Sequence, residues 1–176
     1  MLPGVPKKLD SLLKVELLRD LNTSQVKDIW NQHHEQQQDL AGDAVQPHIF
    51  ENIQQRAKES SLFVFPVRRD KGHFMLLSQF DQKNNMFGLT SLDAYKKSPE
   101  LAPPWMSVLL FDEILHSKQL GLLRAEASSD HLSKSEVVRL LGLVQRYYGT
   151  DDYDRVWTMN HAEHRFDLGA YLATCP

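Results

Sequence analysis

Cysteine is almost absent from this sequence of 176 residues, and long apolar runs are missing altogether. The single cysteine, Cys175, cannot form an intrachain disulfide or a cysteine-based zinc site. No apolar run approaches the roughly 20 residues that a helix needs to span a bilayer. Residues 1–20 mix acidic with basic side chains, unlike a signal peptide or an arginine-rich transit peptide. A reducing compartment is therefore permitted, and no membrane span is expected.

Glycine-rich motifs and clustered positive charge are also missing. The eight glycines are scattered and form no phosphate-binding loop, dinucleotide fingerprint or nucleophile elbow. The formal net charge is −3, and the chain lacks the clustered basic residues that neutralise nucleic-acid phosphates. We therefore expect no nucleotide hydrolysis, no cofactor and no nucleic-acid partner.

What is present is the composition of an ordinary globular domain. Hydrophobic residues make up 41% of the chain and charged residues 24%, far from the composition of disordered proteins. This length corresponds to one domain with one core. We assign residues 9–172 to that domain, residues 1–8 to an N-terminal tail and residues 173–176 to a C-terminal tail. We expect the protein to be a monomer.

The first third of the sequence predicts three helices. Leucines at helical spacing predict a helix over residues 9–21. A second helix should begin after Asn22, which can cap it while Gln25 closes a capping box. After a polar loop around residues 42–43, Pro47 at a first helical position predicts a third helix.

The middle of the chain changes to the shorter period of β-strands. Two aromatic and β-branched runs around the turn-like RRDKG predict a hairpin over residues 62–80. Pro66 lacks an amide hydrogen, which confines its strand to an edge or a bulge. The other expected elements are strands at residues 86–90, 106–111, 120–126 and 153–159, and short helices at residues 91–98 and 112–119.

The clearest single signal lies in the last third of the chain. Ser133 and Glu136 form a capping box, and a long helix with one apolar stripe should run from there to Gly149. A short helix around Tyr171 should close the chain. Together these elements predict a single α+β domain with a mostly antiparallel sheet of five to six strands flanked by helices.

The histidine pairs are the main candidates for chemistry. His161 and His164 could share a helix face, and His33 and His34 are adjacent. A zinc site needs three or four converging ligands, which neither pair supplies locally, so we assign no metal site. The acidic groups after residues 111 and 150 have the character of solvated loops. We therefore assign no catalytic residue.

The stretch SPELAPPWMSVLLFDEI, residues 98–114, offers a candidate for partner binding. Consecutive prolines hold the chain extended before an apolar strand. Trp105, together with Pro104, is then either a core plug at the mouth of that strand or a partner-facing anchor. Leu9, Leu12 and Leu13 form a second candidate face, for which packing within the chain is the alternative.

The order of these features resembles a known family. The stretches IWNQHH, FVFPVRRDKGHFMLLSQF, APPWMSVLLFDEI, LGLLRAE and LSKSEVVRLLGLVQRYY are similar to the mitochondrial ATP synthase assembly factor that chaperones the beta subunit. The resemblance runs from about Leu9 to Leu172. Its most specific parts are the hairpin and the segment Pro103-Pro104-Trp105.

The resemblance implies a mitochondrial matrix chaperone without enzymatic activity. Such a protein holds the unassembled beta subunit of ATP synthase until the alpha subunit replaces it. Family precursors carry an import segment, whereas this chain begins at Met1 without one. Two other hypotheses stay open: a matrix scaffold for another assembly partner, and a metal-dependent enzyme that uses the histidine clusters.

Overall fold

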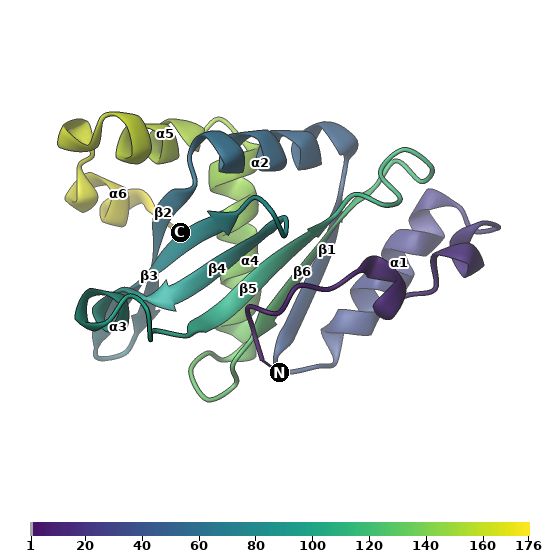
Figure 1. Ribbon diagram of the computed structural model, residues 1–176, viewed down its shortest axis with the longest axis horizontal. Helices are drawn as coiled ribbons and strands as arrows, with labels where there is room; N and C mark the ends of the chain where they lie inside the picture. The colour runs from purple at the N-terminus through teal and green to yellow at the C-terminus, as the bar shows by residue number, and fades with distance from the viewer. Residues whose placement is uncertain (1) are drawn as a thin grey trace.

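A six-stranded antiparallel sheet forms the centre of the protein in the computed structural model, which describes residues 2–176 (Figure 1). The strand order is β1-β6-β5-β4-β3-β2, so β1 and β2 are the edges. This confirms the predicted single α+β domain and its sheet. The strands are β1 (Leu40–Val45), β2 (Leu62–Arg69), β3 (Gly72–Asp81), β4 (Met86–Ser91), β5 (Pro104–Phe111) and β6 (Gly121–Ala127).

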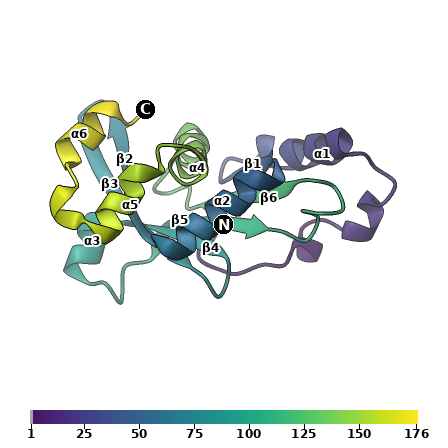
Figure 2. The ribbon, with the colours of Figure 1, turned by 90° about the horizontal axis from the view of Figure 1, so that it is seen from above.

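Helices cover both faces of the sheet. The sheet curls around α4 (Lys134–Gly149) on one face, while α1 (Thr23–Glu35) packs against β1 on the other face (Figure 2). Three short 3-10 turns complete the fold: η1 (Leu9–Ser11), η2 (Val15–Leu18) and η3 (Glu163–Arg165). The α-helices are α1 (Thr23–Glu35), α2 (Pro47–Glu59), α3 (Leu92–Lys97), α4 (Lys134–Gly149), α5 (Tyr153–His161) and α6 (Leu168–Thr174).

The apolar interior is divided into two clusters by the sheet. Alternate residues of β6 point to opposite faces, so Leu122 belongs to the cluster under α1 and Leu123 to the cluster under α4. Trp30 of α1 is almost fully buried in the first of these, and Tyr148 of α4 is fully buried in the second. Both faces of β6 are therefore covered, and every residue of the strand is buried, the charged Arg124 and Glu126 included.

The helix starts follow the sequence signals. Asn22 accepts a hydrogen bond from the Gln25 amide at 2.9 Å while the Gln25 side chain accepts from the Asn22 amide, a complete capping box. Ser133 and Glu136 form the same reciprocal pair at the start of α4. Pro47 opens α2 as predicted. Local side-chain chemistry fixes these three boundaries.

The single helix predicted over residues 9–21 is wrong. The segment forms η1 and η2 with a break between them. At the break the Asp10 carboxylate accepts the Val15 amide hydrogen at 3.2 Å, which draws that amide away from a helical partner. Leu9 and Leu18 turn into the core, whereas Leu17 is 68% exposed. The leucine spacing thus reflects two separate turns.

Three other secondary-structure predictions are also wrong. Gly42 and Asp43 lie in strand β1, not in a loop. Residues 112–119 form turns instead of a helix and include Gln119 at a φ of +55°. Residues 153–159 belong to helix α5, not to a strand, because Val156 and Asn160 turn the same helix face toward β2.

The residues expected to be tails pack against the domain. The Gly4 amide donates a hydrogen bond to the Ser107 hydroxyl on β5. Lys7 forms an ion pair with Glu126 on β6. At the other end Cys175 is buried in the core cluster under α4. The contacts of Gly4 and Lys7 with neighbouring strands show that residues 4–7 cross the sheet over β5 and β6 (Figure 1).

Candidate partner-binding site

Trp105 is partly buried and firmly supported. Its ring stacks on His131 with 4.1 Å between ring centroids and an interplanar angle of 3°, and it meets Phe74 edge-on at 5.6 Å. The pairing of β4 with β5 is irregular at Leu89, which displaces Trp105 from the regular alternation of β5. Pro104, at the start of β5, is also partly exposed. The Trp105 side chain thus packs against the rim of the core cluster under α4 and remains partly exposed.

The candidate leucines of the N-terminal segment divide between interior and rim. Leu9 has no exposed surface and lies in the core cluster under α1. Leu12 and Leu13 are partly buried and pack against the edge of that cluster. Leu9 could reach a partner only if the segment moved, whereas the other two side chains are accessible where they lie.

The histidines do not converge. His33 is exposed, while its neighbour His34 is buried. His161 reaches the Ser60 hydroxyl at 3.1 Å, and His164 is exposed. Within residues 2–176, no three histidine, cysteine, aspartate or glutamate side chains come together as a metal site would require.

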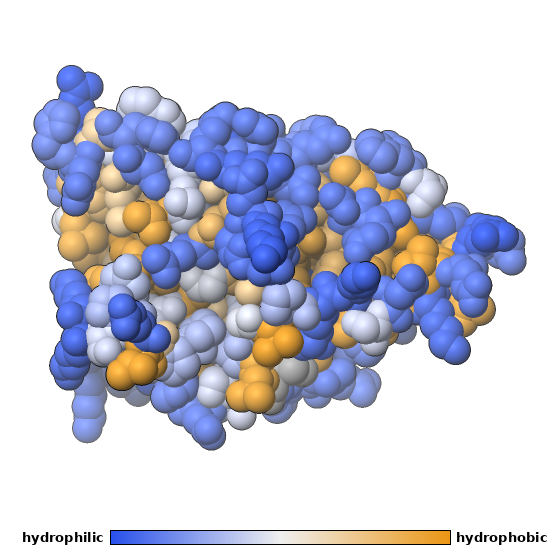
Figure 3. Space-filling model, in the orientation of Figure 1, coloured by the Kyte–Doolittle hydropathy of each residue, from blue (hydrophilic) through white to orange (hydrophobic). Residues whose placement is uncertain are grey.

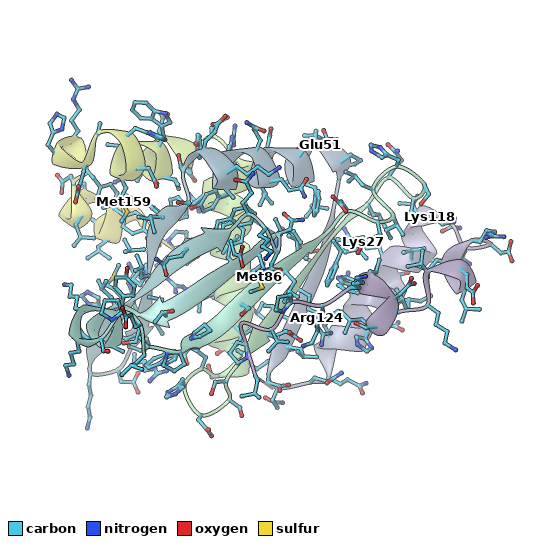
Figure 4. The ribbon with its side chains drawn as sticks, viewed as in Figure 1. Lys27, Glu51, Met86, Lys118, Arg124 and Met159 are labelled. Atoms are coloured by element: carbon cyan, nitrogen blue, oxygen red, sulfur yellow. The ribbon has the colours of Figure 1, made fainter. Side chains whose placement is uncertain are left out.

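A charged network that sequence reasoning missed is buried beneath α1. Arg124 and Glu126 stand two residues apart on β6, so both point to the same face of the sheet. The Arg124 Nε donates to the Glu126 carboxylate at 3.1 Å, and Lys7 binds the same carboxylate. Figure 4 shows Arg124 where the N-terminal segment crosses the sheet. The Glu126 side chain is completely buried, and its carboxylate is stabilised there by the two cations, Arg124 and Lys7.

His34 connects that network to α1. Its Nδ1 lies 2.7 Å from the carbonyl oxygen of Trp30 and therefore donates to it. Its Nε2 lies 3.0 Å from Arg124 Nη1, which can only donate, so Nε2 is the acceptor. Burial, assisted by the neighbouring Arg124, lowers the pKa of His34 to about 4, although the hydrogen bond to the Trp30 carbonyl opposes the shift. The imidazole is therefore neutral at pH 7.

A groove of about 450 Å³ opens beside this network, between α1 and α4. Its floor is the edge of β1, and its walls come from the facing sides of the two helices. The residues used below are Asn31, Glu35, Gly42, Asp43, Val138 and Gly142. They come from three separate segments, which is why no sequence motif indicated the groove. A glycine in the middle of α4 is the one local signal.

Gly42 is required where it stands. A Cβ atom built on this residue would lie 2.5 Å from Nδ1 of His34. The imidazole ring therefore packs directly on the β1 backbone, which only glycine permits at this position. The close approach of α1 to β1 fixes the position of one groove wall.

Comparisons with known proteins place the chain in a family. A family model described as "ATP11 protein" matches residues 3–169. The chain is 30% identical over 149 residues to "Protein atp11, mitochondrial" of Schizosaccharomyces pombe, covering 82% of this chain and 51% of that protein. It is 23% identical over 170 residues to "ATP synthase mitochondrial F1 complex assembly factor 1" of Danio rerio, covering 95% of this chain and 55% of that protein.

The corresponding Mus musculus protein, which has the same name, is 25% identical over 170 residues, covering 95% of this chain and 52% of that protein. The chain thus spans about half the length of the curated relatives it matches. Within residues 2–176, no helix combines the length and apolar character needed to cross a membrane. The family model extends from the N-terminal segment into α6, and on this match the chain belongs to the ATP11 protein family.

Proposed function

We propose that this chain is a mitochondrial matrix chaperone that binds the unassembled beta subunit of ATP synthase. It prevents aggregation of that subunit and promotes assembly of the F1 head without hydrolysing ATP. The observation that carries the proposal is the family match over residues 3–169. The names of the zebrafish and mouse relatives, assembly factors of the mitochondrial F1 complex, support it.

The physical task of such a chaperone is to cover an apolar surface reversibly. A subunit without its neighbours exposes an interface that would otherwise aggregate. The chain offers a groove of moderate size and several exposed apolar side chains, among them Leu2, Leu17 and Leu101. Figure 3 shows apolar areas near the N-terminal segment and beside the loop between α3 and β5, separated by residues of lower hydropathy. Scattered apolar contacts of this kind suit a complex that the alpha subunit must later displace.

The partner surface that we propose includes Trp105 and Pro104, with Leu12 and Leu13 at the rim of the core cluster under α1. The Trp105 ring is held by His131 and Phe74, so it would lose little conformational freedom on binding. A rigid, partly exposed aromatic side chain is typical of an interface hot spot.

The test is an aggregation assay with isolated F1 subunits. Purified chain should suppress light scattering of free beta subunit at a stoichiometric ratio, with and without ATP. Free alpha subunit, treated in parallel, is the specificity control, and its later addition should release the chain from beta subunit. Unchanged scattering of the beta subunit would count against the proposal. Protection of the alpha subunit alone would assign the chain to a different F1 partner.

A further inference from the structure

The backbone of β1 exposes unpaired hydrogen-bonding groups in the groove. Asp39 accepts the Ala127 amide hydrogen at 2.9 Å, and the register with β6 then makes residues 41, 43 and 45 the hydrogen-bonded partners of that strand. The amides and carbonyls of residues 40, 42 and 44 therefore point away from the sheet. Within residues 2–176, neither the amide nor the carbonyl of Gly42 meets a side-chain partner.

The two neighbouring positions confirm this orientation. The Leu40 carbonyl, on the outward side, accepts a hydrogen bond from the Lys134 ammonium. The Ala44 amide, also outward, donates to the Asp43 carboxylate at 2.8 Å. Gly42 lies between them with both its backbone groups open to the groove. An extended segment laid along β1 would find a donor and an acceptor at the centre of the strand.

The opposite edge of the sheet is closed by contrast. Three helices each send one side chain to an outward carbonyl of β2: Asn160 to Leu62 at 2.6 Å, Tyr171 to Val64 at 2.7 Å and Arg139 to Pro66 at 2.6 Å. Asn160 also accepts the Leu62 amide hydrogen at 3.1 Å, and Pro66 has no amide hydrogen to offer. One edge is thus covered by specific contacts, while β1 is left open at Gly42.

The walls leave room for a chain to lie on this edge. A Cβ atom built on Gly142, in the middle of α4, would meet no atom within 4 Å. Val138, one turn earlier on the same helix face, is 52% exposed although it is apolar. A glycine in a helix interior weakens the helix, so a gap at this point has an energetic cost. The cost is understandable if the gap receives another chain.

The polar groups around the groove are mainly acceptors. Glu35 and Asp43 contribute carboxylates, and the buried Oδ1 of Asn31 has no hydrogen-bond partner within residues 2–176. The cation of the lining, Lys134, is already bound to the carbonyls of His34, Gln37 and Leu40. A segment that fits these walls therefore carries a lysine or arginine next to small apolar residues.

We propose that the β1 edge binds an extended segment of the partner protein as a seventh strand of the sheet. The segment pairs its backbone with Gly42, packs a small apolar side chain on Val138 and directs a basic side chain to Glu35 and Asp43. This deepens the proposed function and rests on it for the identity of the partner as an F1 subunit. The mode of recognition, backbone pairing with alternate side chains in pockets, is independent of which subunit it is.

Three variants separate the groove from general effects. Gly142→Arg fills the gap on α4 without a predicted clash, since no atom lies near its Cβ position. Gly142→Ala adds only one methyl group, so it shows how far a more stable α4 alone changes binding without filling the gap. Gln55→Arg adds the same charge at an exposed position of α2, where Glu59 is within hydrogen-bond distance, outside the groove. All three should fold, as circular dichroism will show.

The probes are synthetic 15-residue peptides tiled across the F1 alpha and beta subunits. We expect one or a few peptides with a basic residue among small apolar residues to bind the full chain. Gly142→Arg should weaken that binding by about tenfold or more, Gly142→Ala should weaken it slightly, and Gln55→Arg should leave it unchanged. Amide exchange at Gly42 should slow by about tenfold or more when peptide binds, because a strand partner now accepts its hydrogen.

In the peptide experiments, two results would overturn the inference. One is that no tiled peptide binds the wild-type chain better than it binds Gly142→Arg. The other is binding that leaves exchange at Gly42 unchanged. A second copy of this chain on the edge would instead appear as a dimer in light scattering, with Gly42 protected before any peptide is added, and would also refute a partner segment.

The outcomes distinguish this inference from the proposed function. If Gly142→Arg suppresses aggregation of beta subunit as well as the wild type does, the chaperone role stands and the β1 site fails. If peptides protect Gly42 while the chain does not suppress beta-subunit aggregation, the β1 site stands and the beta-subunit role fails.

Discussion

Acidification should destabilise this protein through one buried imidazole. His34 is 1% exposed, and its Nε2 accepts a hydrogen bond from Arg124 that a protonated ring could not accept. The folded chain therefore holds the pKa of His34 near 4, compared with 6.5 for a free histidine. The unfolded chain binds the proton first as the pH falls, so protonation favours unfolding between these two values.

The size of the effect follows from the two pKa values. The difference between 6.5 and about 4 corresponds to about 3 kcal/mol of unfolding free energy, at roughly 1.4 kcal/mol per pH unit. The contribution is fully present above pH 6.5, and most of it is lost by pH 4.5. Arg124, His33 and Lys134 all disfavour the charged ring together with burial, and the hydrogen bond to the Trp30 carbonyl offsets only part of this lowering.

The assay is urea unfolding followed by tryptophan fluorescence at several pH values from 7.5 to 4.5. His34→Gln should reduce the pH dependence of the unfolding free energy by about 3 kcal/mol over that range. His48→Gln, at an exposed position on α2, is the matched control and should keep the wild-type profile. Parallel profiles for the wild type and His34→Gln would refute the assignment of the acid sensitivity to this ring.

Three further predictions concern packing and charge. Glu126→Ala should cost about 3–5 kcal/mol in urea unfolding, because it leaves the Arg124 charge buried, and Arg124→Leu in the same chain should restore part of this. Trp105→Ala should cost about 2 kcal/mol, less than for a fully buried ring; an unchanged melting temperature with lost binding of beta subunit would identify it as a pure anchor. Gly142→Ala should raise stability by about 0.5–1 kcal/mol, since it improves α4 in open space; a lower melting temperature would contradict that.

The sequence was most informative where a side chain acts on its own neighbours. Asn22 and Ser133 cap helices through residues three positions away, so both boundaries could be predicted. Pro66 likewise excludes a central strand through its own missing amide hydrogen, and β2 is an edge. In each case the cause lies within a few residues of its effect.

Sequence reasoning failed where distant residues decide the structure. The stretch LAGDAV has little strand character, and it is a strand because β6 offers a partner and the His34 ring requires Gly42. Residues 153–159 fit either period, and the contact of Asn160 with Leu62 selects the helix. The groove depends on the same kind of information, since it exists only once 31–43 and 134–145 come together.

The unequal edges of the sheet also limit how the protein can associate with itself. Polymers that grow strand by strand need two compatible edges on every molecule, one to receive and one to be received. The β2 edge is here occupied by the side chains of Asn160, Tyr171 and Arg139. A second copy that paired with β1 therefore could not add a third copy through its own β2 edge. Growth would stop at a symmetric pair of chains, with β1 of each copy in the shared seam.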